Sequence, residues 1–169
     1  MNSKQSTQIK NIANFFKIRF FSCLFLMMIC CGCATNCDKT LVSWVKVKNS
    51  DIRGGTILTI QDGEQFDGII LNQEGRWEAG SDEKKRTKPT DAEVRTGKME
   101  KIATVYKGSE IRMYRDGELV TKYSAQNIDL LRGNENFVVF GLCHYCGDDF
   151  IISEIEDARI YCKALSANE

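Results

Sequence analysis

The sequence predicts an all-β domain, an antiparallel β-sandwich, from two observations. Short runs of alternating apolar and polar residues recur from residue 40 onward and are separated by glycine-containing turns. No segment of useful length shows the 3.6-residue apolar period of an amphipathic helix. Many short strands joined by tight turns pack as two facing sheets, because each sheet must bury one apolar face.

The clearest signal is residues 102–123, which predict three strands folded back on each other. Turns are expected at residues 107–109 and at Asp116-Gly117. Asp-Gly between alternating runs is typical of a type I′ hairpin, which needs positive φ at both central residues. Ile111 and Met113 should face the core, with Arg112 and Tyr114 on the opposite face.

The rest of the body is read as further strands of the same kind. They are expected at residues 40–47, 56–61, 66–71, 76–80, 136–143 and 150–161. The first has apolar residues on both faces, which predicts a central strand. Residues 81–98 are polar and charged without an apolar period, so we expect one long exposed loop in which Gly97 holds no strained turn.

The length of the chain and the distribution of its charge limit the classes of function to consider. The chain has 169 residues, which favours one folded domain, and its formal net charge is zero. Residues 1–37 contain four bases and no acid, so the body carries 19 bases against 23 acids, a net charge of −4. A mildly acidic body argues against nucleic acid as the partner, since phosphate binding requires clustered Lys and Arg.

The N-terminal residues 1–37 have the organisation of an export segment. Lys17 and Arg19 precede an apolar run, residues 20–29, that is followed by small residues and cysteines. The run is short of the roughly 20 residues that span a bilayer, which favours a secretory signal. Gly32-Cys33 resembles a bacterial lipobox and makes Cys33 the candidate lipidated residue. Cleavage after Ala34 and an uncleaved membrane anchor are the alternatives, and all three place the body outside the cytoplasm.

Several motifs carry a family resemblance over residues 39–169. They are Lys39-Thr40-Leu41-Val42-Ser43-Trp44-Val45, Arg53-Gly54-Gly55, Phe66-Asp67-Gly68-Ile69, Arg76-Trp77-Glu78-Ala79-Gly80-Ser81, Tyr114-Arg115-Asp116-Gly117 and the closing Ile155-Glu156-Asp157-Ala158-Arg159-Ile160-Tyr161. Residues 38–169 thus resemble a concanavalin A-like (laminin G-like) jelly roll of the type found in exported planctomycete-type bacterial proteins. Such domains usually carry one or two strands before residue 40, so this copy is expected to lack its first strands or to be open at one edge.

The same fold hosts glucanases, and the resemblance allows a test for their catalytic acids. In those enzymes two Glu and one Asp alternate on one strand, because the nucleophile and the acid must face the same cleft. Here Glu154 matches the first acid, but Glu156 stands in place of Asp and Arg159 in place of the second Glu. We therefore expect a non-catalytic protein in which Glu156, Asp157 and Arg159 form a surface or sheet-edge charge network.

The cysteines and the single histidine allow a metal or a disulfide. A lone Cys-x-x-Cys, Cys143 to Cys146, supplies only two of the four ligands of structural zinc, and His144 and Cys162 could complete the set only if the fold brought them together. In an exported protein, pairing of Cys162 with Cys143 or Cys146 is favoured. Such a bond would close a loop of roughly 20 residues and contribute up to about 3 kcal/mol. Free buried thiols remain the alternative.

A binding function would need exposed aromatic and polar groups. The candidates for a carbohydrate are Trp77, His144, Tyr145 and Phe150, and Asp148 and Asp149 could hold calcium. For Trp44 and Trp77 alike, packing in the core is the default interpretation. The sequence predicts an exported, membrane-tethered module for a glycan or a protein, with no cofactor except calcium. A structural domain, or a remnant of a larger protein, is the second hypothesis, and a glycoside hydrolase is a remote third.

Overall fold

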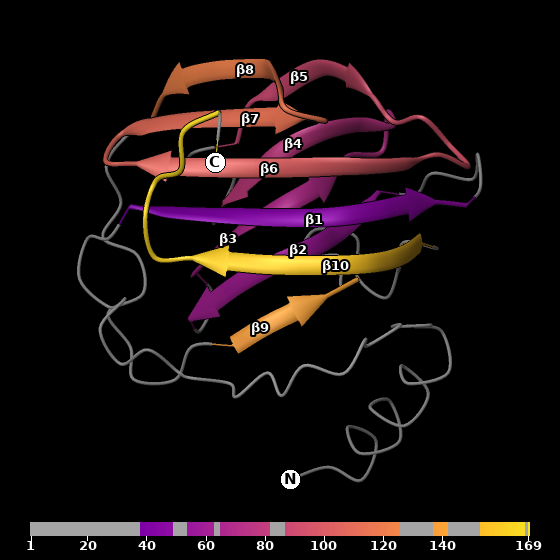
Figure 1. Ribbon diagram of the computed structural model, residues 1–169, viewed down its shortest axis with the longest axis horizontal. Coiled ribbons are helices and arrows are strands. Elements are labelled where there is room, and N and C mark those ends of the chain that lie inside the picture. The colour runs from indigo at the N-terminus through magenta and orange to yellow at the C-terminus, as the bar shows by residue number, and fades with distance from the viewer. Residues whose placement is uncertain are drawn as a thin grey trace, which may run out of the picture.

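The computed structural model describes residues 38–48, 54–62, 65–81, 87–125, 137–141, 153–167 and 169. These residues form ten strands and no helix (Figure 1). The strands make two antiparallel five-stranded sheets that pack face to face, so the prediction of an all-β sandwich is confirmed. None of the described segments is a helix long and apolar enough to cross a membrane.

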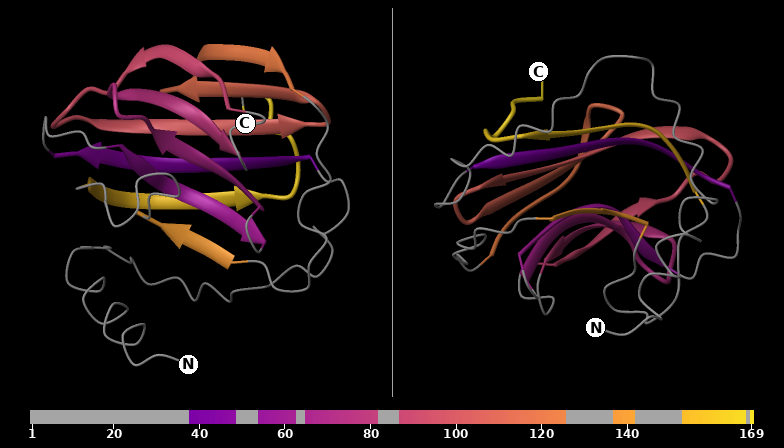
Figure 2. Two further views of the ribbon diagram at one scale, coloured as in Figure 1. Left: turned by 180° about the vertical axis from the view of Figure 1, so that it is seen from behind. Right: turned by 90° about the horizontal axis from the view of Figure 1, so that it is seen from below.

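The first sheet has the strand order β10-β1-β6-β7-β8. Its strands are β10 (Ser153–Tyr161), β1 (Lys39–Val47), β6 (Met99–Lys107), β7 (Glu110–Arg115) and β8 (Glu118–Ser124). β1 lies between β10 and β6, as its two apolar faces predicted. In the right-hand view of Figure 2 this sheet arches over the second sheet.

The second sheet has the order β5-β4-β3-β2-β9. Its strands are β5 (Pro89–Glu93), β4 (Arg76–Ser81), β3 (Gln65–Leu71), β2 (Gly55–Asp62) and β9 (Phe137–Phe140). A bulge in β2 between Thr56 and Leu58 turns both Ile57 and Leu58 into the buried core. Such an extra residue bends the strand and increases its twist locally.

The expectation that residues 81–98 form one exposed loop is wrong. β5 lies within this stretch and pairs with β4. Thr90 and Ala92 are buried, and the Thr90 hydroxyl donates a hydrogen bond of 2.7 Å to the Trp77 carbonyl. Thr90 and Ala92 are the inward-facing residues of β5, and these two small side chains are too weak an apolar signal to predict a strand. Gly97 also departs from expectation, because its φ is +73°.

The β7–β8 hairpin agrees with its sequence. Asp116 has φ +54° and Gly117 has φ +88°, as a type I′ turn requires. Ile111 and Met113 are buried in the core, as predicted. A register shift between Met113 and Tyr114 accommodates the twist of the pair.

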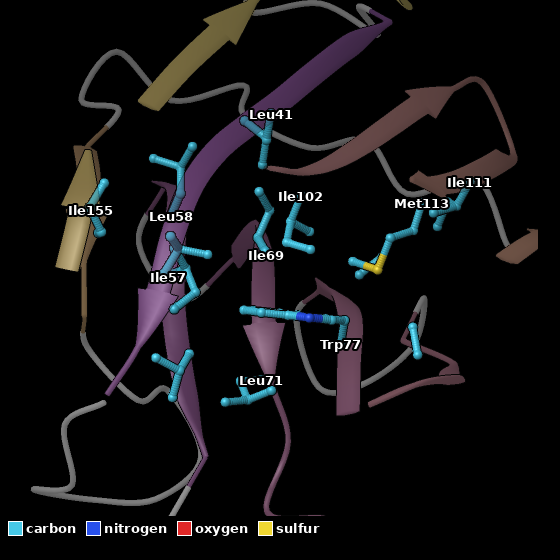
Figure 3. Close-up of a cluster of buried hydrophobic side chains, with 14 of the residues drawn as sticks. Leu41, Ile57, Leu58, Ile69, Leu71, Trp77, Ile102, Ile111, Met113 and Ile155 are labelled. Atoms are coloured by element: carbon cyan, nitrogen blue, oxygen red, sulfur yellow. The ribbon is translucent and has the colours of Figure 1, made fainter. Parts of the chain in front are cut away.

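The core lies between the two sheets and draws on nearly every strand. Its fully buried side chains include Leu41, Val45, Leu58, Ile69, Leu71, Trp77, Ile102 and Met113. Figure 3 shows the Trp77 indole lying across the core beside Ile69, Leu71 and Ile102. Burial of one such aliphatic side chain stabilises the fold by about 1.5–3 kcal/mol.

After β10 the chain crosses the outer face of the first sheet. The Thr40 hydroxyl donates to the Lys163 carbonyl over 2.8 Å and accepts from the Leu165 amide over 3.0 Å. The Leu165 side chain is buried. One side chain at the start of β1 therefore fixes the segment that follows β10.

Candidate ligand-binding face

Trp77 lies in the core, which agrees with the default interpretation of this residue, so its candidacy for carbohydrate binding is wrong. Its side chain is 0% exposed in the core. It alternates with Ala79 on the inward face of β4, which the sequence pattern could not distinguish from the outward face. Among the described residues its indole N–H finds no acceptor.

The other candidate residues lie outside the described part of the chain. This applies to the aromatic and histidine candidates His144, Tyr145 and Phe150, to the calcium candidates Asp148 and Asp149, to the disulfide candidates Cys143 and Cys146, and to Cys33. In the described residues no three His, Cys, Asp or Glu side chains are grouped so that they could hold a metal ion. The roles assigned to these residues therefore stay predictions.

Cys162, directly after β10, is disulfide-bonded. It is the one cysteine among the described residues, so its partner lies beyond them. The choice between Cys143 and Cys146 stays a prediction.

Trp44 lies on the outer face of the first sheet, so the default interpretation that it packs in the core is wrong. In β1 the side chains of Leu41, Val45 and Val47 enter the core, and Trp44 stands on the opposite face, partly exposed. Its cross-strand neighbours are Lys101 on β6 and Asp157 on β10. A large aromatic side chain thus sits between two polar side chains of the neighbouring strands, outside the core.

Two cations flank the indole of Trp44. The Lys101 Nζ lies 5.4 Å from the ring centroid, and the Arg159 Cζ lies 4.9 Å from it. The two side chains come from strands on opposite sides of β1. Distances below about 6 Å are those of cation–π attraction, which contributes about 0.5–1 kcal/mol at exposed sites.

Arg159 is held in place by further contacts. Its Nε donates to Asp157 Oδ2 over 2.8 Å, and its Nη2 lies 2.7 Å from the same oxygen. Hydrogen bonds with Tyr161 and Asp157 raise the pKa of Arg159 above its ordinary value. We call Trp44, Lys101, Asp157, Arg159 and Tyr161 the Trp44 face.

The backbone under Lys101 is also fixed. The Asp116 amide donates to the Lys101 carbonyl over 2.8 Å, and the Lys101 amide donates to Asp116 Oδ1 over 2.9 Å. Asp116 in turn pairs with Arg95, whose Nε donates to the buried Glu100 over 2.9 Å. The side chains of the Trp44 face therefore project from rigid strands, which favours a preorganised site.

A second polar cluster lies between the sheets and is closed to ligands. Lys39 Nζ is 2.7 Å from Asp67 Oδ2 and 5.6 Å from the centre of the Tyr106 ring. The Tyr106 hydroxyl donates to the Gly80 carbonyl over 2.9 Å and accepts from the Gly68 amide over 3.2 Å. All three residues are buried, so this cluster stabilises the contact between the sheets.

The acids of β10 do not reproduce the glucanase arrangement. Asp157 lies opposite Trp44 and Glu154 opposite Lys46, while Glu156 is the extra residue at the bulge and is exposed. Asp157 is paired with Arg159, so that part of the expected charge network is confirmed. The bulge breaks the alternation that would aim successive acids into one cleft.

Sequence reasoning missed Trp44, Lys101 and Arg159 as a group. The alternation of Leu41, Ser43, Val45 and Val47 could have placed Trp44 on the outer face. The neighbours of Trp44 depend on the registers of β6 and β10, which the sequence alone did not specify.

Comparison with known families decides where the chain belongs. A laminin G-type family model, described as the concanavalin A-like lectin/glucanases superfamily, matches residues 33–169. The chain belongs to this superfamily. The resemblance inferred from the motifs of residues 39–169 is therefore confirmed. A comparison with curated proteins finds no match.

Solved structures resemble this lectin-like domain at low sequence identity. A putative carbohydrate binding protein from Bacteroides ovatus has a TM-score of 0.63 and 15% identity, over 79% of this chain and 40% of that one. Domain 4 of AbnA, a GH43 extracellular arabinanase from Geobacillus stearothermophilus solved with arabinotriose, has a TM-score of 0.59 and 18% identity, over 80% and 65%.

A sialidase from Trypanosoma rangeli also shares the fold, with a TM-score of 0.59 and 14% identity over 78% of this chain. The lectin-like domain spans only 22% of the sialidase chain. These likenesses show the jelly-roll fold.

Proposed function

We propose that this chain is a non-catalytic carbohydrate-binding module, exported and held at a membrane by its N-terminal segment. Two of the similar structures support the ligand class, since one is named a putative carbohydrate binding protein and the other was solved with arabinotriose. The superfamily itself includes lectins.

The observation that carries the proposal is the position of Trp44. Sugar rings expose apolar C–H groups on their faces and hydroxyls at their rims, so they are bound by an aromatic surface with polar groups around it. The Trp44 face has this composition, with the indole at its centre and Lys101, Asp157 and Arg159 beside it.

The absence of catalysis is part of the proposal. A retaining glycosidase needs two carboxyl groups about 5 Å apart facing one cleft. In β10, Asp157 beside Trp44 forms an ion pair with Arg159. The Oε2 atom of Glu154 lies 3.8 Å from Lys48 Nζ. Both pairings suit a surface better than a catalytic dyad.

A glycan array tests the proposal. The purified chain is compared with Trp44→Ala and with Leu119→Ala, which removes a 52% exposed side chain from β8 of the same sheet. We expect the chain and the Leu119 variant to retain the same glycans and the Trp44 variant to lose them. Retention of no glycan by the folded chain would contradict the function, and unchanged binding by Trp44→Ala would move the site elsewhere.

Export and tethering rest on residues 1–37 and need their own test. If Cys33 carries a lipid, Cys33→Ser should release the protein from the membrane fraction or block its processing. Cys23→Ser, in the apolar run of the same N-terminal segment, is the control for replacing a cysteine there. Fatty-acid labelling that persists in Cys33→Ser would refute lipidation at that residue and leave the signal-peptide alternative.

A further inference from the structure

The two cations of the Trp44 face differ in how they are neutralised. Arg159 has Asp157 as its carboxylate partner. Lys101 Nζ lies over the indole, and within the described part of the chain it meets no carboxylate. The ammonium beside Trp44 is thus available to an anion from outside.

The positive charge beside Trp44 is opposite in sign to the net charge of residues 38–169. Residues 38–169 carry a net charge of −4, while in the described part of the chain the Trp44 indole contacts two cations, of which only Arg159 is paired with a carboxylate. A cationic spot on an acidic protein attracts anions to that place and discourages binding elsewhere. The indole adds an apolar surface directly next to the charge.

We propose that the Trp44 face binds acidic sugars, of which uronic acids are the simplest class. The apolar face of a uronate ring packs on the exposed part of the Trp44 indole, and its carboxylate accepts hydrogen bonds from Lys101. Arg159 stays fixed by Asp157 and Tyr161 and flanks the sugar on the other side. This inference rests on the proposed carbohydrate binding and names its ligand class.

The geometry favours a rigid, compact anion over a flexible one. Trp44 and Lys101 are direct cross-strand partners, so the indole and the Lys101 ammonium group lie side by side on the same face of the sheet. A uronate presents its ring face and its carboxylate at the same short separation. The Asp116 hydrogen bonds to the Lys101 backbone hold this spacing before the ligand arrives.

The experiment measures binding of the full chain to a trisaccharide of galacturonic acid and to its methyl ester. The ester keeps the rings and removes the charge. The variants are Lys101→Met, which keeps most of the aliphatic stem, and Trp44→Phe. Lys107→Met is the control, since Lys107 is an exposed residue on the same strand and the same face, six residues away. Tryptophan emission is a second readout, because Trp77, the other tryptophan, is fully buried.

We expect the acid to bind at least about tenfold more tightly than the ester, as one charge-assisted hydrogen bond supplies. Lys101→Met should lose about tenfold for the acid and nothing for the ester, with Lys107→Met unchanged. The ligand-dependent change in emission should vanish in Trp44→Phe.

Four outcomes would overturn the inference. Equal affinity for acid and ester, or equal losses in Lys101→Met and Lys107→Met, would remove the role of Lys101. Binding of neutral glycans without uronates would refute the acidic class and leave carbohydrate binding intact. Failure to bind any glycan, with an acidic peptide bound instead, would refute both.

Discussion

Lys39 Nζ lies 2.7 Å from Asp67 Oδ2 and joins β1 of the first sheet to β3 of the second. The Lys39 side chain is 11% exposed and the Asp67 side chain 0% exposed. A charge pair so far from water depends on both partners, because either one alone would leave an uncompensated buried charge.

Removal of one partner should therefore be costly. Lys39→Met should lower the free energy of unfolding by about 3–5 kcal/mol, whereas Lys39→Met with Asp67→Leu should recover most of the loss. Urea midpoints with matched slopes measure both. Lys46→Met, on the outer face of the same strand, is the control. Similar midpoints for Lys39→Met and Lys46→Met would show that the pair contributes little.

The β7–β8 turn makes a prediction about backbone conformation alone. Gly117 has φ +88°, and a Cβ added there would meet nothing within 4 Å. Gly117→Val should thus lose about 1–2 kcal/mol through its left-handed backbone and not through a clash. Gly117→Asn should lose less, since Asn tolerates this region. Equal urea midpoints for the two variants would argue against the turn.

Gly97 should behave like Gly117. It has φ +73° and open space around its Cα, and its amide donates to the Val47 carbonyl over 2.7 Å. Gly97→Val should therefore lower the urea midpoint about as much as Gly117→Val does.

Asp116 should make stability depend on pH. Burial raises its pKa, but hydrogen bonds from the Lys101 amide and the Arg95 guanidinium outweigh this and lower the pKa below its ordinary value of 3.8. A lowered pKa stabilises the folded state above 3.8, and this contribution is lost as pH falls through the folded-state value.

Asp116→Asn keeps an acceptor for the Lys101 amide and removes the charge. The variant should be less stable than the natural chain at pH 7, and the difference should shrink toward pH 3. Urea unfolding across this range is the measurement. If the difference in unfolding free energy between the two proteins stays constant with pH, Asp116 stabilises the fold through its hydrogen bonds and not through its charge.

The acids of β10 should have no catalytic effect. The purified chain should hydrolyse no β-glucan, and Glu154→Gln and Glu156→Gln should behave identically to it in reducing-sugar assays. Hydrolysis that either substitution abolishes would overturn the non-catalytic proposal.

The sequence predicts the strands far better than the site. Gly-based turns and alternation place nine of the ten strands, because those signals are local. β5 escapes because its inward residues, Thr90 and Ala92, are small. Trp77 and Trp44 show the limit for side chains. A one-residue difference in face decides between core and surface, and the neighbours of each depend on pairing between distant strands.

The clasp that Thr40 makes with the Lys163 carbonyl and the Leu165 amide has a mechanical consequence. β1 begins where β10 ends, with Thr40 opposite Tyr161. A force that pulls residue 38 away from residue 165 would load the Thr40 hydrogen bonds first. Once they break, the hydrogen bonds between β1 and β10 would be lost one pair after another, because the strands are antiparallel and are pulled from the same end. The domain should thus unfold at low force along this direction, and the Thr40 hydrogen bonds should be the contacts that resist the force first.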